Sequence, residues 1–464
     1  MTVFINRTIN LKKIKAIGLD MDYTIVRYNT EAFEELTHKE VLAKLVSLKN
    51  YPEKIKTLKF EFERSIQGLV IDKKRGHLLK ISRYGKVKEA YHGLEPLDFK
   101  TQQDIYANRI IDLALHQFQS LDTSFSISNG VLYSQLVQLK REGMELPDFY
   151  NLADDIKEIL DICHGDGTIK DQVREDLERF IIKDKEIVHL LERYKDYGKQ
   201  LIVITNSDYN YTKLLLDYAI NPFLENHKDW SELFDITITL SRKPAFFTNE
   251  ASFLKIDLES GLMSNHFGKV ESGVYQGGSA HKLQKDLGLN GEEILYLGDH
   301  IYGDVVSIKK TFNWRTALIL DPLKDELNSI KKSSSVQKKI DKLMGEKQDL
   351  EYKINEIEIK KFEARKNKTT SDEVKAFKEE LNKVYAQIEK INTEISDLIT
   401  EYRSHFNPYW GELMRAGQEE SRMADQVEKY ACLYMIKISD LFSHSPRTYF
   451  RPEKRILPHE VENL

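Results

Sequence analysis

Two aspartates, Asp20 and Asp22, stand two residues apart in the segment Asp20-Met-Asp-Tyr-Thr24, where an apolar run ends. Carboxylates at this spacing can approach one centre. The first can attack a phosphorus atom, while the second exchanges protons with the leaving and entering oxygens. Aspartates also end strands and cap turns without any catalytic role, so the pair needs support from other residues.

Three further polar segments follow later apolar runs, and their side chains suit a phosphoryl group. Thr205-Asn206-Ser207 offers hydroxyl, amide and backbone N–H groups, which can cradle phosphate oxygens. Lys243 supplies a cation that could neutralise these oxygens. Gly298-Asp299 adds a third carboxylate, and clustered carboxylates at a phosphoryl site are the usual setting for Mg²⁺. Asp304 would hold a water molecule of the metal ion or orient Lys243.

The elements that must position these residues are predicted to be parallel β-strands. Uninterrupted apolar runs are typical of strands that are buried on both faces of a sheet. The clearest such run is 201–204, within the predicted strand 199–205, and further strands are predicted at residues 14–19, 234–240, 293–297 and 316–320. Their alternation with helical stretches predicts an α/β fold with a doubly wound, mainly parallel, Rossmann-like sheet. Ligands bind at the carboxyl ends of the strands in such sheets, where the candidate residues would meet.

The catalytic core is expected to comprise residues 1–30 and 170–330. Residues 31–169 are far more than a strand-to-helix connection needs, so we expect them to form a cap over the active site that selects the substrate. Within this cap the pattern predicts a helix first, then a β-meander at residues 68–93, and then mostly helices.

A different pattern begins after the core. Lys331–Ser335 interrupts the apolar periodicity, and steps of three and four then predict an antiparallel, coiled-coil-like helical hairpin for residues 331–402. The hairpin could be an arm for oligomerisation or partner docking, or a helix pair packed on its own domain. Residues 403–464 are expected to pack on the core, with helix between 411 and 441.

The composition excludes several classes of protein. A hydrophobic fraction of 41% and a charged fraction of 31% indicate a globular chain, and the net charge of -5 excludes a globally basic nucleic-acid binder. No apolar run approaches the roughly 20 residues of a membrane span, and residues 1–15 lack the order of a secretory signal. Only two cysteines, Cys163 and Cys432, are present, which supports neither a disulfide framework nor a cysteine-based zinc site and favours a cytoplasmic location.

The four polar segments resemble the motifs of the haloacid dehalogenase superfamily. They match as Asp20-x-Asp22-x-Thr24, Thr205-Asn206, Lys243 and Gly298-Asp299-x₄-Asp304. The resemblance implies an aspartyl-phosphate on Asp20, with Asp22 as general acid and then base. It implies Mg²⁺ as cofactor, held by the side chains of Asp20 and Asp299 and by the backbone carbonyl of Asp22. Phosphate oxygens would be held by Thr205, Asn206, Ser207 and Lys243.

Longer segments are similar to the cytosolic purine 5′-nucleotidases that prefer IMP and GMP. These segments are Asp20-Met-Asp-Tyr-Thr24, Thr205-Asn-Ser-Asp-Tyr209, Arg242-Lys-Pro-Ala-Phe-Phe247, Gly277-Gly-Ser279, Gly298-Asp-His-Ile-Tyr-Gly-Asp304 and Gln426-Val-Glu-Lys-Tyr-Ala-Cys-Leu-Tyr434. The similarity implies hydrolysis of purine nucleoside 5′-monophosphates and phosphoryl transfer to a nucleoside. It also implies a homo-oligomer, a dimer or a tetramer, and a nucleotide effector site that includes Tyr302 and Gln426.

One predicted helix of the cap places Lys157, Asp161 and His164 on one face. A cation can donate to O6 of a 6-oxopurine and a carboxylate can accept from N1–H, which adenine would leave unmatched. An ordinary ion pair on a solvated helix has the same pattern. The resemblance implies that these three residues contact the substrate base, with Lys157 where the family usually has Arg. It also implies that Phe125 stacks on the base, although a core aromatic is an equal alternative.

Two other functions remain open at this point. The chain could be a phosphatase of the same superfamily for another small phosphoester. It could also be a scaffold whose helical hairpin binds a partner and whose catalytic core is vestigial. Neither nucleic acid nor a membrane is expected as a partner.

Overall fold

The structure is a computed structural model that describes residues 3–366, 371–454 and 459–460. The chain divides into two compact units, each of which is described by itself. The first comprises Met1–Leu323 and Leu413–Leu464, and the second comprises Lys324–Glu412. Across the described ranges, no helix has the length and apolar character that crossing a membrane requires.

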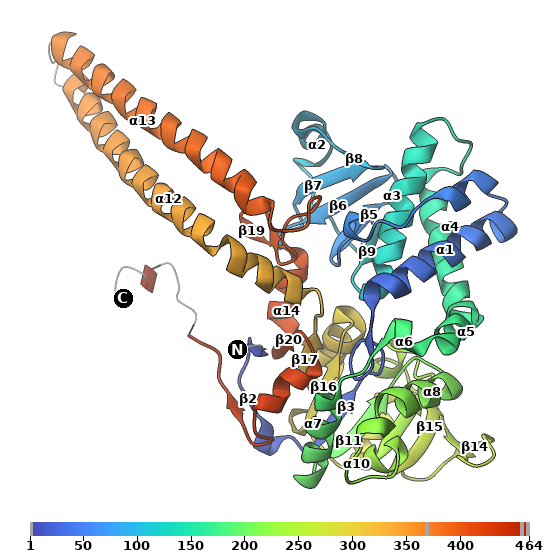
Figure 1. The fold of residues 1–464 in the computed structure, drawn as a ribbon. Coiled ribbons are helices and arrows are strands. Elements are labelled where there is room, and N and C mark those ends of the chain that lie inside the picture. Colours follow the sequence, from blue (N-terminus) through green and yellow to red (C-terminus); the bar gives the residue numbers. More distant parts are fainter. Residues whose placement is uncertain (1–2, 367–370, 455–458, 461–464) are drawn as a thin grey trace. The chain divides into compact units, whose positions relative to one another are not determined.

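A ten-stranded sheet forms the centre of the first unit (Figure 1). Its strands are β1 (Val3–Ile5), β3 (Ala16–Leu19), β11 (Gln200–Ile204), β12 (Ile236–Thr239), β13 (Phe253–Ile256), β14 (Met263–His266), β15 (Gly273–Gly277), β16 (Ile294–Gly298), β17 (Arg315–Ile319) and β20 (Leu433–Met435). Their order is β1-β20-β17-β16-β3-β11-β12-β15-β13-β14. The run from β20 to β15 is parallel, and β1, β13 and β14 are antiparallel to their neighbours. The predicted α/β fold with a mainly parallel sheet is therefore confirmed.

The strand order explains where a ligand can bind. From β3 the chain adds β11 and β12 on one side, and it later adds β16 and β17 on the other side. The direction of winding therefore switches between β3 and β16, and such switch points open a crevice at the carboxyl ends of the strands. Apolar side chains of these strands, such as Ile202, Ile236 and Ile294, form a buried core together with Trp314.

Helices and short strands complete this part of the first unit. The helices are α7 (Lys185–Asp196), α8 (Tyr209–Ala219), α9 (Trp230–Leu233), α10 (Ala280–Leu287), α11 (Ser307–Phe312) and α14 (Arg422–Tyr430). The short strands are β2 (Ile9–Asn10), β4 (Arg27–Tyr28), β10 (Ile181–Ile182), β18 (Arg415–Ala416), β19 (Glu419–Glu420) and β21 (Tyr449–Phe450). Asp208 begins α8 as an N-cap, since its carboxylate accepts from the backbone N of Tyr211 at 2.9 Å.

The chain between β4 and β10 forms an insert with its own sheet (Figure 1). Five antiparallel strands lie in the order β8-β7-β6-β5-β9. They are β5 (Leu69–Asp72), β6 (His77–Ile81), β7 (Val87–His92), β8 (Glu95–Pro96) and β9 (Phe118–Leu121). The helices are α1 (Thr30–Lys49), α2 (Phe99–Tyr106), α3 (Ile127–Arg141), α4 (Phe149–Gly165), α5 (Thr168–Glu175) and α6 (Leu177–Phe180). The sequence predicted the meander of β5 to β7, whereas β9 fell in a stretch predicted to be mostly helical.

The second unit contains two long helices, α12 (Leu323–Lys366), which begins at the last residue of the first unit, and α13 (Ser371–Arg403). Between them, Ile357, Leu381 and Val384 form a buried apolar seam. The helix α12 is continuous through Lys331–Ser335, where the sequence pattern indicated a break. Serines are tolerated there because a hydroxyl can bond to the preceding turn: Ser333 Oγ donates to the carbonyl of Ser329 at 2.8 Å.

The prediction for residues 411–441 was wrong in part. The pattern indicated a helical segment, but the α-helix there is α14 alone, followed by β20 and a 3₁₀ segment at Ile438–Ser443. The strand β20 is three residues long, too short for its pattern to be told from that of a helix. It joins the central sheet between β1 and β17.

Candidate active site

Asp20 and Asp299 leave two neighbouring parallel strands at the same edge of the sheet. Asp20 directly follows β3 and donates its backbone N–H to the carbonyl of Leu297 at 2.8 Å, while Asp299 directly follows β16. Asp304 lies in the π-helical turn Ile301–Val306. Carboxylate oxygens of Asp20, Asp299 and Asp304 lie within 4.8 Å of one another, and all three residues are buried.

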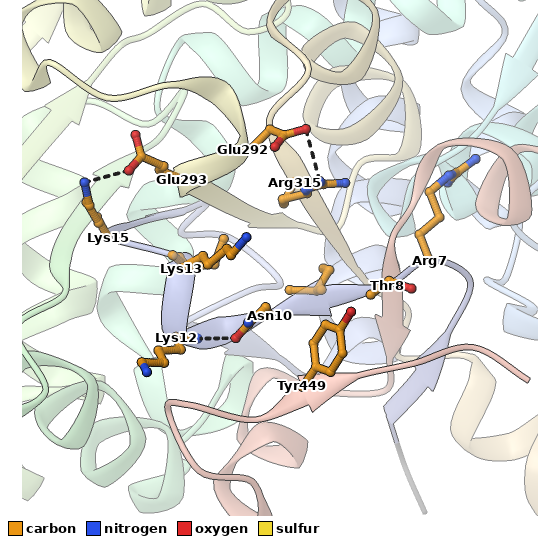
Figure 2. A pocket seen from close by; sticks show the side chains of 12 residues that line it. Arg7, Thr8, Asn10, Lys12, Lys13, Lys15, Glu292, Glu293, Arg315 and Tyr449 are labelled. Carbon is orange, nitrogen blue, oxygen red and sulfur yellow. Dashed lines mark hydrogen bonds and ion pairs between the residues drawn. The ribbon is translucent and has the colours of Figure 1, made fainter.

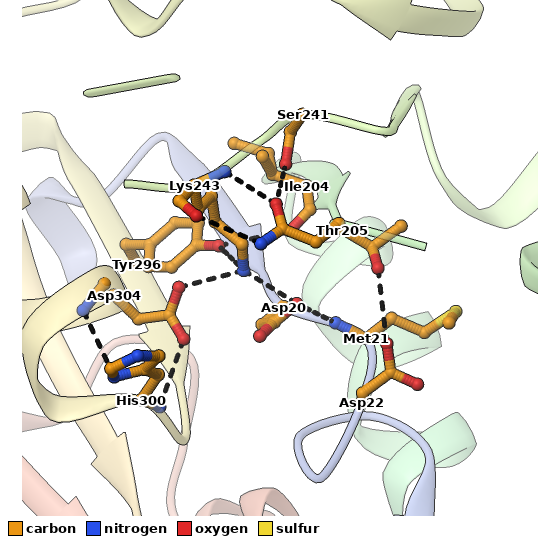
Figure 3. A network of polar contacts seen from close by, with 12 residues as sticks. Asp20, Met21, Asp22, Ile204, Thr205, Ser241, Lys243, Tyr296, His300 and Asp304 are labelled. Atoms are coloured by element: carbon orange, nitrogen blue, oxygen red, sulfur yellow. Dashed lines mark hydrogen bonds and ion pairs between the residues drawn. The ribbon is translucent and has the colours of Figure 1, made fainter. Parts of the chain in front are cut away.

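Lys243 faces this carboxylate cluster (Figure 3). Its Nζ lies 2.8 Å from Asp20 Oδ1 and 2.9 Å from Asp304 Oδ1, and it also donates to the hydroxyl of Tyr296 at 3.1 Å. The side chain of Lys243 is only 5% exposed. A buried ammonium between two carboxylates is held in one position, so it can act as a fixed cation beside Asp20.

Burial and mutual repulsion shape the electrostatics of the cluster. Burial raises the pKa of Asp20 well above its usual value, and the Lys243 ammonium offsets this only in part. Burial, followed by the negative charge of Asp20, likewise raises the pKa of Asp299. Although burial alone would lower the pKa of Lys243, the charges of Asp20 and Asp304 raise it well above its usual value. One ammonium therefore faces three carboxylates, an excess of negative charge that favours a further cation.

The donor set fits a divalent metal ion. Asp299 Oδ2 is buried and has no hydrogen-bond partner among the described residues, which is costly for a carboxylate oxygen unless a cation binds it. Hard divalent cations prefer carboxylate oxygens as ligands. Asp20 and Asp299 would hold the ion, with Asp304 adjacent.

Hydroxyl groups surround the carboxylate of Asp22. Tyr28 donates to Asp22 Oδ1 at 2.6 Å, and Ser207 Oγ donates to Oδ2 at 2.9 Å. Thr205 Oγ1 lies 3.4 Å from the same Oδ2 and accepts from the backbone N of Ser207 at 3.0 Å. The side chains of Asp22, Thr205 and Ser207 are thus brought together beside Asp20, while the side chain of Asp22 points into this hydroxyl network.

Asn206 is placed differently from its neighbours. Its Oδ1 accepts from the backbone N of Lys243 at 2.6 Å and from Ser241 Oγ at 3.0 Å, and its Nδ2 donates to the carbonyl of Lys243 at 3.1 Å. The amide therefore fixes the loop that carries Lys243. Asn206 therefore has a positioning role here, and the phosphate contact that the sequence predicted for it stays a prediction.

An aromatic cluster connects Asp22 with the insert. The ring of Phe125 lies 4.6 Å from that of Tyr23 and 6.1 Å from that of Tyr28. The ring of His164 lies 5.7 Å from Phe125 and stacks on Phe33 at 6.3 Å. Burial, and then the charge of Lys170, lower the pKa of His164 to about 4, so its imidazole is neutral at pH 7. Phe125 and His164 are two of the four residues predicted to contact the substrate base, and their rings thus lie next to each other, close to Tyr23 and Tyr28.

The other two predicted base contacts are exposed. Lys157 and Asp161 lie on α4 with exposed side chains. Neither makes a hydrogen bond or an ion pair with another residue in the described ranges. The helical spacing places them on the same face of α4 as His164, but among the described residues no hydrogen bond, ion pair or cation–ring contact joins them to Phe125.

Four of the site residues described here were not predicted: Tyr28, which donates to Asp22, and Tyr296, Tyr211 and Lys170. Tyr296 lies inside a buried strand, where its hydroxyl contacts Lys243 and donates to the carbonyl of Ile204 at 3.3 Å. The signal was a phenol in the otherwise aliphatic run Ile294-Leu-Tyr-Leu297. Tyr211 contacts the hydroxyl of Tyr28 at 3.2 Å, and Lys170 pairs with Asp208 at 2.7 Å. Nothing in their local patterns singles them out.

Tyr302 and Gln426, which the resemblance placed at an effector site, lie on adjoining elements. Tyr302 is 52% exposed in the turn Ile301–Val306, and Gln426 lies on α14, which packs against that turn. The Oε1 of Gln426 is buried with no hydrogen-bond partner among the described residues.

Gly298 is required by the position of Asp304. A Cβ at residue 298 would lie 2.4 Å from Asp304 Oδ2 and 2.5 Å from its Cγ. We expect Gly298→Ala to lower the free energy of unfolding by about 2 kcal/mol through overpacking and to lower activity by displacing Asp304 from Lys243. Urea denaturation monitored by circular dichroism measures the first effect. Gly165→Ala is the matched control, because a Cβ there meets nothing within 4 Å; equal stability of the two variants would contradict the steric argument.

Comparison with known proteins agrees with this geometry. The model of the 5′ nucleotidase family matches residues 3–462. A 5′-nucleotidase domain-containing protein of Dictyostelium discoideum is 25% identical over 99% of this chain and 75% of its own length. The 5′-nucleotidase domain-containing protein 2 of Rattus norvegicus is 25% identical over 99% of this chain and 80% of its own length. A crystal structure of a predicted phosphoglycolate phosphatase from Haemophilus somnus matches 66% of this chain and 85% of that chain at 12% identity and a TM-score of 0.29, a likeness too slight to interpret.

Proposed function

The chain belongs to the 5′ nucleotidase family, and from that membership we propose that it is a Mg²⁺-dependent phosphatase that hydrolyses IMP and GMP to nucleoside and phosphate. The observation that carries the proposal is the pairing of Lys243 with Asp20 beside a buried oxygen of Asp299 that has no hydrogen-bond partner in the described part of the chain. The same covalent intermediate would allow phosphoryl transfer to a second nucleoside. A cytoplasmic location and a dimeric or tetrameric state stay predictions.

Each step of the proposed reaction uses groups described above. The Asp20 carboxylate attacks phosphorus, so that an Asp20–phosphate bond forms and the bond from phosphorus to the sugar O5′ breaks. Asp22 would act first as general acid, giving a proton to O5′, and then as general base, taking a proton from the water that cleaves the aspartyl-phosphate. This second attack releases inorganic phosphate and restores both carboxyl groups.

Phosphate oxygens would be held by Lys243 and by the hydroxyl of Thr205. Tyr28 and Ser207 both donate to Asp22, so they hold its carboxyl group in one position. A Mg²⁺ ion on Asp20 and Asp299 supplies charge neutralisation of the phosphoryl group when bound. Because Lys243 is desolvated, its charge acts on the phosphoryl oxygens with little screening by water.

For the base we propose a site on the insert, which then acts as a cap. Phe125 and His164 supply an aromatic wall close to Asp22. Lys157 would donate to O6 of the purine, and Asp161 would accept from N1–H. Both side chains are exposed and unpaired with other described residues, so they are available to a ligand on that face of α4.

The first test measures phosphate release from a panel of nucleoside monophosphates and from p-nitrophenyl phosphate, with Mg²⁺ or with EDTA. We expect release that needs Mg²⁺ and is fastest with IMP and GMP. Activity on the generic ester without purine preference would keep the chemistry and exclude the proposed base contacts. No release from any substrate would favour a scaffold with a vestigial core.

A specific variant tests the base contacts. Asp161→Ala should lower kcat/KM for IMP and GMP by about tenfold to a hundredfold, because the N1–H would lose its acceptor. Hydrolysis of p-nitrophenyl phosphate, which has no such donor, should change less than about twofold. Asp104→Ala is the control, because Asp104 is exposed on α2 of the insert and makes no hydrogen bond or ion pair with another described residue. Equal losses on all substrates would show that Asp161 acts on the fold and not on the base.

The exposure of Lys157 and Asp161 also favours a second candidate function. With no contact joining them to Phe125, the aromatic wall alone could accept another small phosphoester. In that case the Asp20 chemistry is retained, Asp161→Ala has little effect on any substrate, and a broader panel of phosphoesters identifies the preferred one.

A further inference from the structure

A pocket of the first unit lies at the edge of the central sheet opposite to the carboxylate cluster (Figure 2). It is lined by residues 7–15, Glu292–Glu293, Arg315 and Tyr449, and its volume is about 560 Å³. Lys15 directly precedes β3, Glu293 directly precedes β16, and Arg315 begins β17. The pocket therefore lies at the amino ends of strands whose carboxyl ends carry the catalytic carboxylates. The rise along β3 separates Lys15 from Asp20 by roughly 16 Å.

Cations dominate the lining of this pocket. Five of its side chains are basic and two are acidic. Both acidic groups are already paired: Glu293 with Lys15 at 2.6 Å, and Glu292 with Arg315 at 3.3 Å. Figure 2 shows these two pairs, as dashed lines, among the side chains that line the pocket. Three positive charges, those of Arg7, Lys12 and Lys13, remain without an acidic partner in the described part of the pocket.

These three charges are not neutralised by their other contacts. The guanidinium of Arg7 donates to the carbonyls of Lys429 and Ala431, which are neutral acceptors. Lys12 and Lys13 are exposed, with the carboxamide of Asn10 accepting only from the backbone N of Lys12 at 3.1 Å. The cations also act on a neighbour: burial first, and then the charges of Arg315 and Arg7 among others, lower the pKa of Lys309. Positive potential is thus concentrated here in a chain whose net charge is -5.

We propose that this pocket binds a polyphosphorylated small molecule. Three uncompensated cations spread from Arg7 to Lys13 exceed the charge of one phosphate group, which carries about −1.5 to −2 at pH 7, and match two or three linked phosphoryl groups. Arginine and lysine are the usual partners of phosphate oxygens. The volume is in the range of small-molecule sites, which favours such a ligand over a nucleic acid strand.

Tyr449 indicates where the rest of the ligand could lie. Its ring is 47% exposed in the wall of the pocket, and the guanidinium of Arg451 lies 4.4 Å from its centroid. An exposed phenol ring is a stacking surface for a planar base. The ligand could therefore be a nucleoside polyphosphate, or a polyphosphate without a base.

Isothermal titration calorimetry with tripolyphosphate, in EDTA and at fixed low ionic strength, tests the proposal on the full chain. We expect the double variant Lys12→Glu/Lys13→Glu to bind about tenfold or more weakly than wild type, because two attractive charges become repulsive. Lys100→Glu/Lys185→Glu changes the net charge equally at exposed positions outside the pocket and should bind like wild type. Any binding at the carboxylate site is common to all variants and cancels in the comparison.

Two results would overturn the proposal: no binding of tripolyphosphate to wild type at millimolar concentration, or equal weakening in both double variants. Thermal unfolding checks that each variant is folded, and Lys12→Gln/Lys13→Gln serves as the milder pair, with a smaller loss expected. A parallel titration with ATP identifies the source of the phosphates. Tighter binding of ATP than of tripolyphosphate, with the gain removed by Tyr449→Ala, supports a nucleotide. Equal binding supports a polyphosphate without a base.

Discussion

Asp20→Asn is expected to lower phosphate release by at least about 10⁴-fold at saturating substrate, because the amide cannot form the covalent intermediate. The fold should tolerate the change. Burial disfavours the charged form of Asp20, and Lys243 retains Asp304 at 2.9 Å as a partner. We therefore expect the free energy of unfolding to stay within about 2 kcal/mol of wild type. Steady-state kinetics and urea denaturation measure the two effects.

The effect of Mg²⁺ on the melting temperature gives a second measurement on this variant, independent of activity. In wild type, added Mg²⁺ should raise the melting temperature, because a ligand that binds the folded state stabilises it. The increase should be smaller in Asp20→Asn and in Asp299→Asn, since each loses a carboxylate of the cluster. Asp72→Asn replaces a buried carboxylate of the insert and should leave the metal response intact. Full activity of Asp20→Asn would exclude Asp20 as the nucleophile.

Lys243→Met should remove activity by about 10³-fold or more and also destabilise the fold. Without the ammonium, Asp20 and Asp304 face each other as buried, unpaired carboxylates, and breaking a buried pair in this way costs about 3–5 kcal/mol. The pKa of Asp20 would rise further, so the carboxyl would be protonated and unable to attack phosphorus. Kinetics at several pH values and urea denaturation measure both losses.

The double variant Lys243→Met/Asp304→Asn separates the two effects. Removing one carboxylate relieves the unpaired charge, so stability should return most of the way to wild type. Activity should stay low, because the cation beside the phosphoryl group is still missing. Recovery of activity together with stability would mean that Lys243 serves the fold and not the reaction.

The sequence predicted those parts of the site that are encoded locally. The five expected parallel strands are present, and Asp20 and Asp299 follow directly after β3 and β16. The apolar residues of β3 and β16 predict buried strands, and the aspartate that follows each strand predicts the site, so both could be predicted from the same short segment of sequence. The carboxyl ends of parallel strands must meet at one edge, so the approach of Asp20, Lys243 and Asp299 followed from the fold class.

Other features depend on contacts between distant segments and left no local trace. β20 has three residues and takes its conformation from pairing with β1 and β17. Likewise, β13 and β14 extend the sheet as antiparallel strands, although the residues of β14 are mostly exposed. The hydroxyl network of Asp22 depends on Tyr28 and Tyr211. Their hydroxyls are in contact although the two residues are far apart in the sequence, so the contact could be seen only in three dimensions.

The position of β3 in the middle of the sheet has a consequence for synthesis on the ribosome. Both neighbours of β3 come much later in the chain, and Asp299 follows Asp20 by more than half of the 464 residues. A nascent chain that has emerged only as far as the insert carries Asp20 and Asp22 on a strand without partners. The pairing that brings β16 to β3 is strongly non-local, and non-local pairing is slow to form. Unfinished chains therefore expose the two aspartates without Asp299 beside them, and the carboxylate cluster can assemble only after β16 has been translated.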